Sequence, residues 1–115
     1  MLKLIALIKK QPQLSADEFQ AYYETNHAPL VQRLLPMIVR YTRSYMPAEP
    51  AVTGKTGSTD FDALTELWFS GQEDLDAFWV RIRESEVIAA IRADEANFLL
   101  SDRTLMYEVQ ERLSD

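Results

Sequence analysis

The residues between Phe19 and Pro29 form the part of this chain best suited to chemistry. They read F-x-x-Y-Y-x-x-x-H-x-P and include His27, the only histidine among the 115 residues. An unperturbed imidazole titrates at about pH 6.5, so His27 is a natural group for proton transfer near neutral pH. A lone histidine is more often a hydrogen-bonded packing residue, and the sequence leaves both interpretations open.

Two phenols accompany this histidine on what we expect to be one helix. Tyr23 lies about one helical turn before His27, and Tyr22 is a near neighbour on that face. A phenol can orient an imidazole or donate a hydrogen bond to a developing oxyanion. We therefore expect Tyr23 to act with His27 in catalysis and Tyr22 to contact a ligand. The alternative for both is a core aromatic with its hydroxyl at the surface.

Further residues complete the candidate site. Asn26 can donate a hydrogen bond to a ligand carbonyl, or it can cap a broken helix. Glu66 alternates with Trp68 along a predicted strand, so both point to one face, and Glu66 can serve there as a second acid/base group. Its alternative role is to pair with Arg40 or Arg43 on the adjacent strand. Aromatic side chains that we expect to line the pocket, and that core packing also explains, are Phe19, Trp68, Phe69 and Trp79.

The chain contains few groups that bind a metal or a cofactor. One histidine, no cysteine and no H-E-x-x-H pattern leave only scattered carboxylates, so no metal site is expected. The run from Gly54 to Gly57 resembles part of a phosphate-binding loop, but Glu49 stands where the leading glycine belongs. We expect no cofactor. A haem would need His27 as its axial ligand and stays open as the alternative.

Composition and charge narrow the class of protein. The length fits one domain over residues 1–115, and the hydrophobic fraction of 47% is ordinary for a globular protein. The net charge is −6 and no basic stripe occurs, so neither nucleic acid nor an acidic membrane surface is an expected partner. The absence of cysteine fits a reducing compartment. The apolar run Leu2–Ile8 is too short to span a bilayer and lacks the flanks of a signal peptide, which favours a cytoplasmic location.

The pattern of apolar residues predicts the elements that would hold the candidate site. Leu2–Lys9 reads as a strand with apolar residues on both faces. Ser15 and Glu18 form an S-x-x-E capping box at the start of a helix. Pro29 lacks an amide hydrogen, so this helix should kink or break around Asn26–Ala28, where the histidine lies.

Three more strands and a second helix follow. A second S-x-x-E pattern, from Ser70 to Glu73, predicts the start of the second helix, with a break near Glu84–Ser85. Residues 47–60 read as a polar loop. The further strands are expected at Met37–Met46, Ala63–Ser70 and Thr104–Val109. The order β-α-β-β-α-β indicates an α+β, ferredoxin-like fold, with a four-stranded antiparallel sheet and helices on one face.

The second face of such a sheet is uncovered in a single chain. Ile5, Leu7, Leu67 and Phe69 lie on strands in which one register or the other points to that face. A large apolar face is unfavourable in water. We therefore expect a two-fold homodimer in which the sheets pack against each other.

Three separated segments resemble the signature of the EthD domain, named after a component of ethyl tert-butyl ether degradation. They are Ser15–Val31 (SADEFQAYYETNHAPLV), Asp60–Ser70 (DFDALTELWFS) and Ala93–Leu99 (ADEANFL). They occur in the right order and are spread over most of the chain, from Ser15 to Leu99. The family often has Trp at the position of Tyr23, so a phenol here changes the wall of the implied pocket.

The resemblance implies the dimeric α+β barrel fold and a small organic ligand bound between sheet and helices. Relatives of similar build act without cofactors on aromatic or polyketide-like molecules, as cyclases, dehydratases or monooxygenases. The resemblance thus implies an acid/base enzyme of this type. The alternatives are an oxidoreductase component and a non-catalytic accessory protein of a degradation pathway.

Overall fold

The computed structural model describes residues 1–47 and 60–114. The segment 54–57, which resembles a phosphate-binding loop, lies outside the described residues, as does most of the predicted loop 47–60. The elements follow the predicted order. They are β1 (Leu2–Ile8), α1 (Ala16–Tyr22), the π-helical turn η1 (Tyr23–His27), α2 (Ala28–Leu34), β2 (Arg40–Tyr45), β3 (Ala63–Phe69), α3 (Gln72–Ile82), α4 (Ser85–Glu95), the 3-10 turn η2 (Ser101–Arg103) and β4 (Leu105–Val109).

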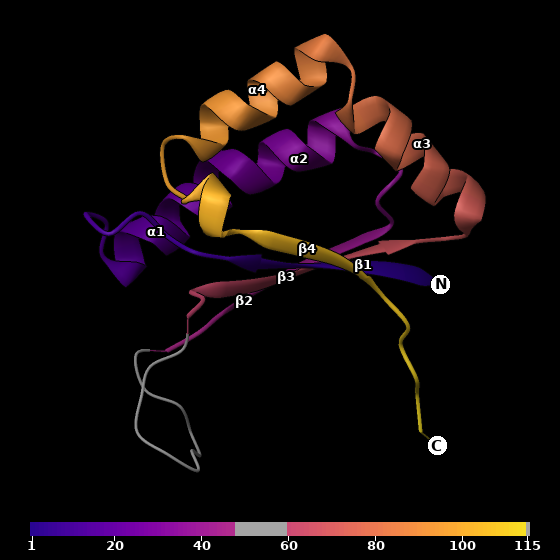
Figure 1. The fold of residues 1–115 in the computed structure, drawn as a ribbon, viewed down its shortest axis with the longest axis horizontal. Coiled ribbons are helices and arrows are strands. Elements are labelled where there is room, and N and C mark those ends of the chain that lie inside the picture. Colours follow the sequence, from indigo (N-terminus) through magenta and orange to yellow (C-terminus); the bar gives the residue numbers. More distant parts are fainter. Residues whose placement is uncertain (48–59, 115) are drawn as a thin grey trace.

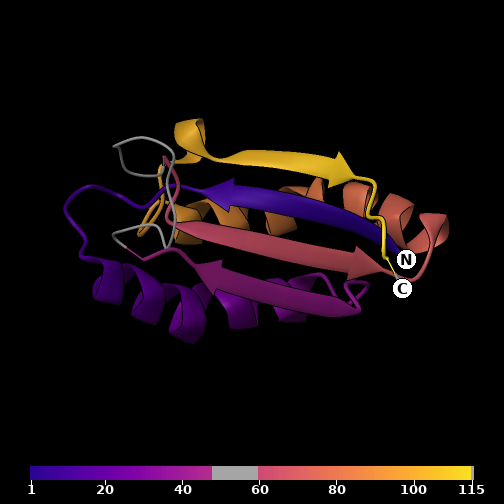
Figure 2. The ribbon, with the colours of Figure 1, turned by 90° about the horizontal axis from the view of Figure 1, so that it is seen from below.

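The four strands form one antiparallel sheet in the order β2-β3-β1-β4. The helices of residues 1–47 and 60–114 lie on one face of this sheet, and none of them covers the other face, which we call the bare face (Figure 1). Helices α1 and α2 run along the β2 edge, whereas β4 forms the opposite edge (Figure 2). The predicted α+β, ferredoxin-like fold is confirmed.

Alternation along the central strands decides which side chains meet the helices. In β1, Leu4, Ala6 and Ile8 are buried under the helices, and Ile5 and Leu7 point to the bare face. In β3, the antiparallel register puts Thr65, Leu67 and Phe69 on the helix side and Leu64, Glu66 and Trp68 on the bare side. Of the residues considered for the bare face, Ile5 and Leu7 lie there, and Leu67 and Phe69 do not.

The two predicted capping boxes have different outcomes. Ser15 accepts a hydrogen bond from the amide of Glu18 at 3.1 Å, and the Glu18 carboxylate accepts one from the amide of Ser15 at 2.9 Å. The second box is wrong. Gly71, not Ser70, precedes the first turn of α3, and no side chain caps that helix. Glycine is an acceptable residue at this position without a side-chain cap.

The predicted discontinuity of the first helix is a π-helical turn. It covers Tyr23–His27, so the irregularity begins six residues before Pro29. The amide of Ala28 donates to the carbonyl of Tyr23, five residues back, and Pro29 then lies in the first turn of α2, where its missing amide hydrogen is not needed. The turn places both Tyr23 and His27 in the interior.

Within residues 1–47 and 60–114, no helix has both the length and the apolar character needed to cross a bilayer.

Candidate functional site

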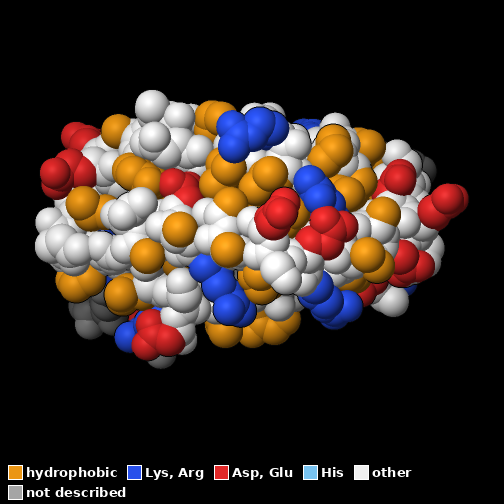
Figure 3. Space-filling view, turned by 90° about the horizontal axis from the view of Figure 1, so that it is seen from above, with side chains coloured by type: hydrophobic (Ala, Val, Ile, Leu, Met, Phe, Trp, Pro, Cys, Tyr) orange, Lys and Arg blue, Asp and Glu red, His pale blue; other side chains and the backbone are white. Residues whose placement is uncertain are grey.

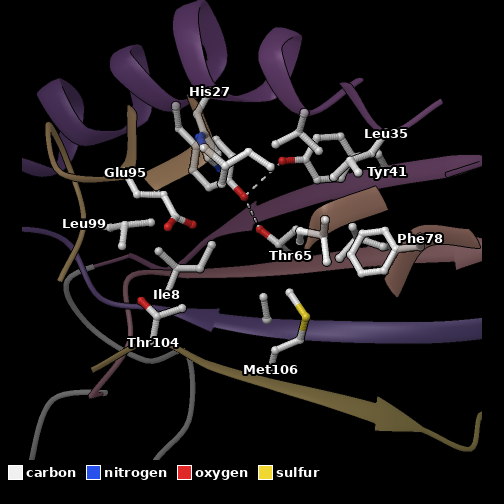
Figure 4. A pocket seen from close by; sticks show the side chains of 16 residues that line it. Ile8, His27, Leu35, Tyr41, Thr65, Phe78, Glu95, Leu99, Thr104 and Met106 are labelled. Atoms are coloured by element: carbon white, nitrogen blue, oxygen red, sulfur yellow. Dashed lines mark hydrogen bonds between the residues drawn. The ribbon is translucent and has the colours of Figure 1, made fainter. Parts of the chain in front are cut away.

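A cavity of about 80 Å³ lies between the sheet and the helices, with His27 on its wall (Figure 4). Most of its lining is aliphatic. The polar groups come from four elements and the segment before β4: Tyr23, His27, Tyr41, Thr65, Glu95 and Thr104. The lining residue Met106, on the edge strand β4, is 44% exposed. Pockets for drug-sized ligands span about 300–1,000 Å³, so this one suits a fragment-sized group.

His27 is buried and held by a carboxylate. Its side chain sits at the end of the π-helical turn, with only 5% of the residue exposed, and no histidine is visible on the helix side of the surface (Figure 3). Nδ1 lies 2.8 Å from Oδ2 of Asp94 on α4. Because an ionised carboxylate can only accept, Nδ1 carries the hydrogen and Nε2 carries the lone pair. Nε2 is therefore the ring nitrogen available to a ligand.

Asp94 is itself fixed by a second donor. The hydroxyl of Tyr22 donates to Oδ1 of Asp94 at 2.6 Å, and the side-chain amide of Asn97 donates to that hydroxyl oxygen at 2.9 Å. Each oxygen of the Asp94 carboxylate thus has its own partner. Such supporting hydrogen bonds orient a histidine and select its tautomer.

Burial sets the protonation state of the imidazole. Removal from water lowers the pKa of His27 below its ordinary value, and the nearby Asp94 carboxylate opposes this with a smaller effect. The net direction is downward, so His27 is neutral at pH 7 and can accept a proton. The ring of the fully buried Phe98 packs against the imidazole, with 4.9 Å between the ring centroids, and keeps water from that side.

Tyr23 joins the cavity through its hydroxyl. The Tyr23 oxygen lies 2.5 Å from Oγ1 of Thr65, and Tyr41 donates to it at 3.3 Å (Figure 4). Burial raises the pKa of both phenols, so they stay protonated at neutral pH. Tyr23 contacts His27 edge to face, with ring centroids 5.3 Å apart. The sequence-predicted pair Tyr23 and His27 therefore borders one cavity.

The other residues predicted for the site lie elsewhere. Phe19 is buried in the core beside Tyr23 and does not line the cavity. Tyr22 supports Asp94 from outside, and it borders a surface groove together with Asn26. Trp79 borders a shallow depression on α3.

Glu66 and Trp68 point together, as predicted, but to the bare face of the sheet. Glu66 forms an ion pair with Lys3 and accepts a hydrogen bond from Thr42 at 3.3 Å. Neither Arg40 nor Arg43, the arginines suggested as partners, forms an ion pair with Glu66. The Trp68 ring lies between Lys3 and Arg40, each 4.7 Å from its centroid. The sheet thus separates both residues from His27.

Sequence reasoning missed two acidic residues of the site. Asp94 binds His27, and its neighbour Glu95 lines the cavity. Both belong to the segment ADEANFL, which carries part of the EthD resemblance. That segment was the only signal, because nothing in its spacing shows which residue meets a histidine on another helix.

A haem on His27 does not fit this structure. The cavity of about 80 Å³ is far smaller than a porphyrin ring. Across the described parts of the chain, no group of three or more His, Cys, Asp or Glu side chains is arranged to hold a metal ion.

Comparison with known proteins agrees with this architecture. The model of the EthD domain matches residues 11–102. The chain therefore belongs to the EthD family. No curated protein matches it.

Solved structures show the same fold. An EthD family protein from Bacillus halodurans C-125 is 25% identical, with a TM-score of 0.67, over 97% of this chain and 99% of that one. An EthD-like protein from Ralstonia eutropha JMP134 is 23% identical, with a TM-score of 0.63, over 96% and 94%. A protein from Bacteroides fragilis NCTC 9343, described as dimeric with a ferredoxin-like fold, is 15% identical, with a TM-score of 0.55, over 94% and 95%.

Proposed function

We propose that this protein binds a small, largely apolar organic molecule in the cavity between sheet and helices. His27 acts there as a general base whose orientation is set by Asp94. The observation that carries this proposal is the 2.8 Å hydrogen bond from Nδ1 of His27 to Asp94, made by an imidazole that borders the cavity. A neutral imidazole with a free Nε2 is the group that general-base catalysis near neutral pH requires.

The Asp94–His27 pair favours catalysis over simple carriage. A carrier or accessory protein needs an apolar cavity and a few polar contacts. It does not need a carboxylate that fixes the tautomer of a buried histidine, with a second donor, Tyr22, to fix the carboxylate. The same arrangement of base and orienting acid supports proton transfer in unrelated enzymes.

We also propose that two copies pack their bare sheet faces together. Leu64, Leu7 and Leu105 lie side by side across three strands on that face. Tyr107 of β4 lies beside Ile5 on the same face and is 50% exposed. Burying such a face stabilises by about 25 cal/mol per Å² of apolar area removed from water. The dimeric Bacteroides fragilis protein has a similar fold, which supports this arrangement.

Ligand titration tests the binding proposal. Phenol, benzaldehyde and acetophenone are added to untagged protein, and the single imidazole signal is followed by NMR. We expect a saturable shift of the His27 signal. The variant Val31→Phe fills the cavity and should abolish it, whereas Leu30→Phe, on the same helix but outside the cavity, should not.

Thermal unfolding shows whether each variant is folded, because an added ring in a packed site costs about 1–3 kcal/mol. A His27 signal that no compound shifts, or that shifts equally in folded Val31→Phe, would contradict binding in this cavity.

A further inference from the structure

Glu95 is a second titratable group on the wall of the cavity that contains His27. It is the last residue of α4, and its carboxyl group points inward, toward Ile8 (Figure 4). Glu95 is half-buried, and the cavity lining around it includes the aliphatic side chains of Ile91 and Leu99. A carboxyl group in such surroundings needs a reason to be there, because burial of its charged form is costly.

The Glu95 carboxyl group has no hydrogen bond or ion pair with any residue in 1–47 or 60–114. In the same residues, no fully buried side-chain oxygen or nitrogen lacks a partner. The Glu95 oxygens therefore keep some access to open space, and the cavity is the open space that they line. A ligand in the cavity would meet a carboxyl group with its hydrogen-bonding capacity unused.

Asp94 and Glu95 point in different directions from the end of α4. Adjacent residues on a helix point about 100° apart, because one turn takes 3.6 residues. The Asp94 carboxylate accepts hydrogen bonds from Nδ1 of His27 and from Tyr22, and Asp94 does not line the cavity. Glu95 turns into the cavity, which His27 also borders. One carboxylate thus orients the base, and the other is left for the ligand.

We infer that Glu95 is a catalytic acid that works with His27 on a small carbonyl compound bearing a C–H next to the carbonyl. This inference rests on the proposed function of His27 as the base. In the apolar cavity, Glu95 would donate its proton to the carbonyl oxygen while Nε2 of His27 removes the proton from the neighbouring carbon. The reaction class is keto–enol proton transfer.

The atoms and electrons of this step balance without a cofactor. The C–H bond breaks, and its electron pair forms the carbon–carbon double bond. The π pair of the carbonyl takes the Glu95 proton, which gives an enol, an imidazolium and a carboxylate. In the reverse direction, His27 returns a proton to carbon and the enol hydroxyl returns its proton to Glu95. Both groups are then restored.

The charges around Glu95 fit the role of an acid. Burial raises the pKa of its carboxyl group above the ordinary value, and the negative charge of Asp94 adds to this. The positive charge of Arg92 on the same helix lowers this pKa by more than Asp94 raises it, but by less than burial does. His27, facing the same cavity, is neutral at pH 7. The protonated form of Glu95 is thus more populated than for an exposed glutamate.

Exchange of carbon-bound hydrogen in D₂O tests this inference without knowledge of the natural substrate. Acetone and acetophenone are incubated with the untagged protein, and loss of the α-proton signal is followed by ¹H NMR. The proteins compared are the wild type, Glu95→Gln and His27→Gln, with Glu86→Gln as the control on the exposed side of α4. Binding of each ketone is measured in parallel from the His27 signal in the three proteins that keep this residue.

We expect the wild type and Glu86→Gln to accelerate exchange. Glu95→Gln should bind the ketone but exchange it about 100-fold more slowly, and it should lose the fall in rate with rising pH that titration of an acid produces. Exchange in folded Glu95→Gln at the wild-type rate would overturn the role of Glu95. Binding without exchange in the wild type would overturn the carbonyl class but leave the proposed binding function standing. A failure of every ligand to bind would overturn both.

Discussion

His27 and Asp94 form one hydrogen-bonded unit, with 2.8 Å between Nδ1 and Oδ2, although 67 positions separate them in the chain. The contact joins the π-helical turn η1 to α4 above the sheet. It fixes the tautomer of an imidazole that burial keeps neutral, and it leaves Nε2 as the free nitrogen.

Replacement of Asp94 by Asn should disturb His27 in a measurable way. A carboxylate accepts from both His27 and Tyr22, whereas an amide has one oxygen acceptor, so one donor loses its partner. We expect a loss of about 1–3 kcal/mol in the free energy of unfolding. The pKa of His27 should fall further, because the Asp94 carboxylate raises it in the wild type. NMR titration and urea unfolding measure these effects, and Asp76→Asn, at an exposed site on α3, is the control.

The free energy of unfolding should depend on pH through His27. Its pKa is lower in the folded protein than in the unfolded chain, so the unfolded chain binds the proton first as the pH falls. The stability that neutral His27 allows is complete above about pH 6.5 and is lost as the pH falls toward the folded-state pKa.

A comparison with His27→Gln isolates this effect. The stability of the wild type minus that of the variant should decrease from pH 7 to pH 5. Glu95, whose pKa is shifted upward, is present in both proteins, so its own contribution largely cancels. A difference that stays constant or grows over this range would show that the pKa of His27 is not lowered by folding.

Replacement of Tyr23 by Phe should destabilise the cavity wall. The hydroxyl of Tyr23 bonds Thr65 at 2.5 Å and accepts from Tyr41 at 3.3 Å, and Tyr23 is 1% exposed. Its removal leaves two buried hydroxyls with fewer partners, so we expect a loss of about 1–3 kcal/mol by urea unfolding. Thr25→Val, which removes a hydroxyl from an exposed residue of the π-helical turn, should change stability by less than about 0.5 kcal/mol. Equal losses of stability in the two variants would contradict the hydrogen bonds that we assign to the Tyr23 hydroxyl.

A charge on the bare face of the sheet should break the proposed dimer. Leu7 lies between Leu64 and Leu105 on that face, so Leu7→Glu puts a carboxylate in the middle of the apolar row. Light scattering at micromolar concentration should give twice the chain mass for the wild type and the chain mass for this variant. Val80→Glu, at a 64% exposed site on α3, should stay dimeric. A monomeric wild type would overturn the sheet-to-sheet packing.

Local rules predicted much of the architecture. The capping box at Ser15, the alternation in β1 and the break before Pro29 depend on residues close in the chain, and each is present. The failure at Ser70 is also local. The S-x-x-E spacing is the same there, but Gly71 takes the capping position, one residue later.

Only part of the site was predicted, because the remaining residues reach it through tertiary contacts that the sequence does not show. His27 and Tyr23 share a helical face and could be paired from the sequence. Asp94 could not be matched to His27, because the angle between two helices is set by packing. Glu66 and Trp68 were placed on one strand face correctly, but only the register with β1 shows that this face is the bare one.

The protonation and tautomer of His27 test the central claim most directly. The chain has one histidine, so the imidazole of untagged, ¹⁵N-labelled protein gives a single assignable pair of nitrogen signals. At pH 7 we predict a neutral ring with hydrogen on Nδ1 and a free Nε2 whose signal moves when a ligand saturates the cavity. A ring that carries its hydrogen on Nε2, or that is positively charged at this pH, would contradict the account of His27 as the base.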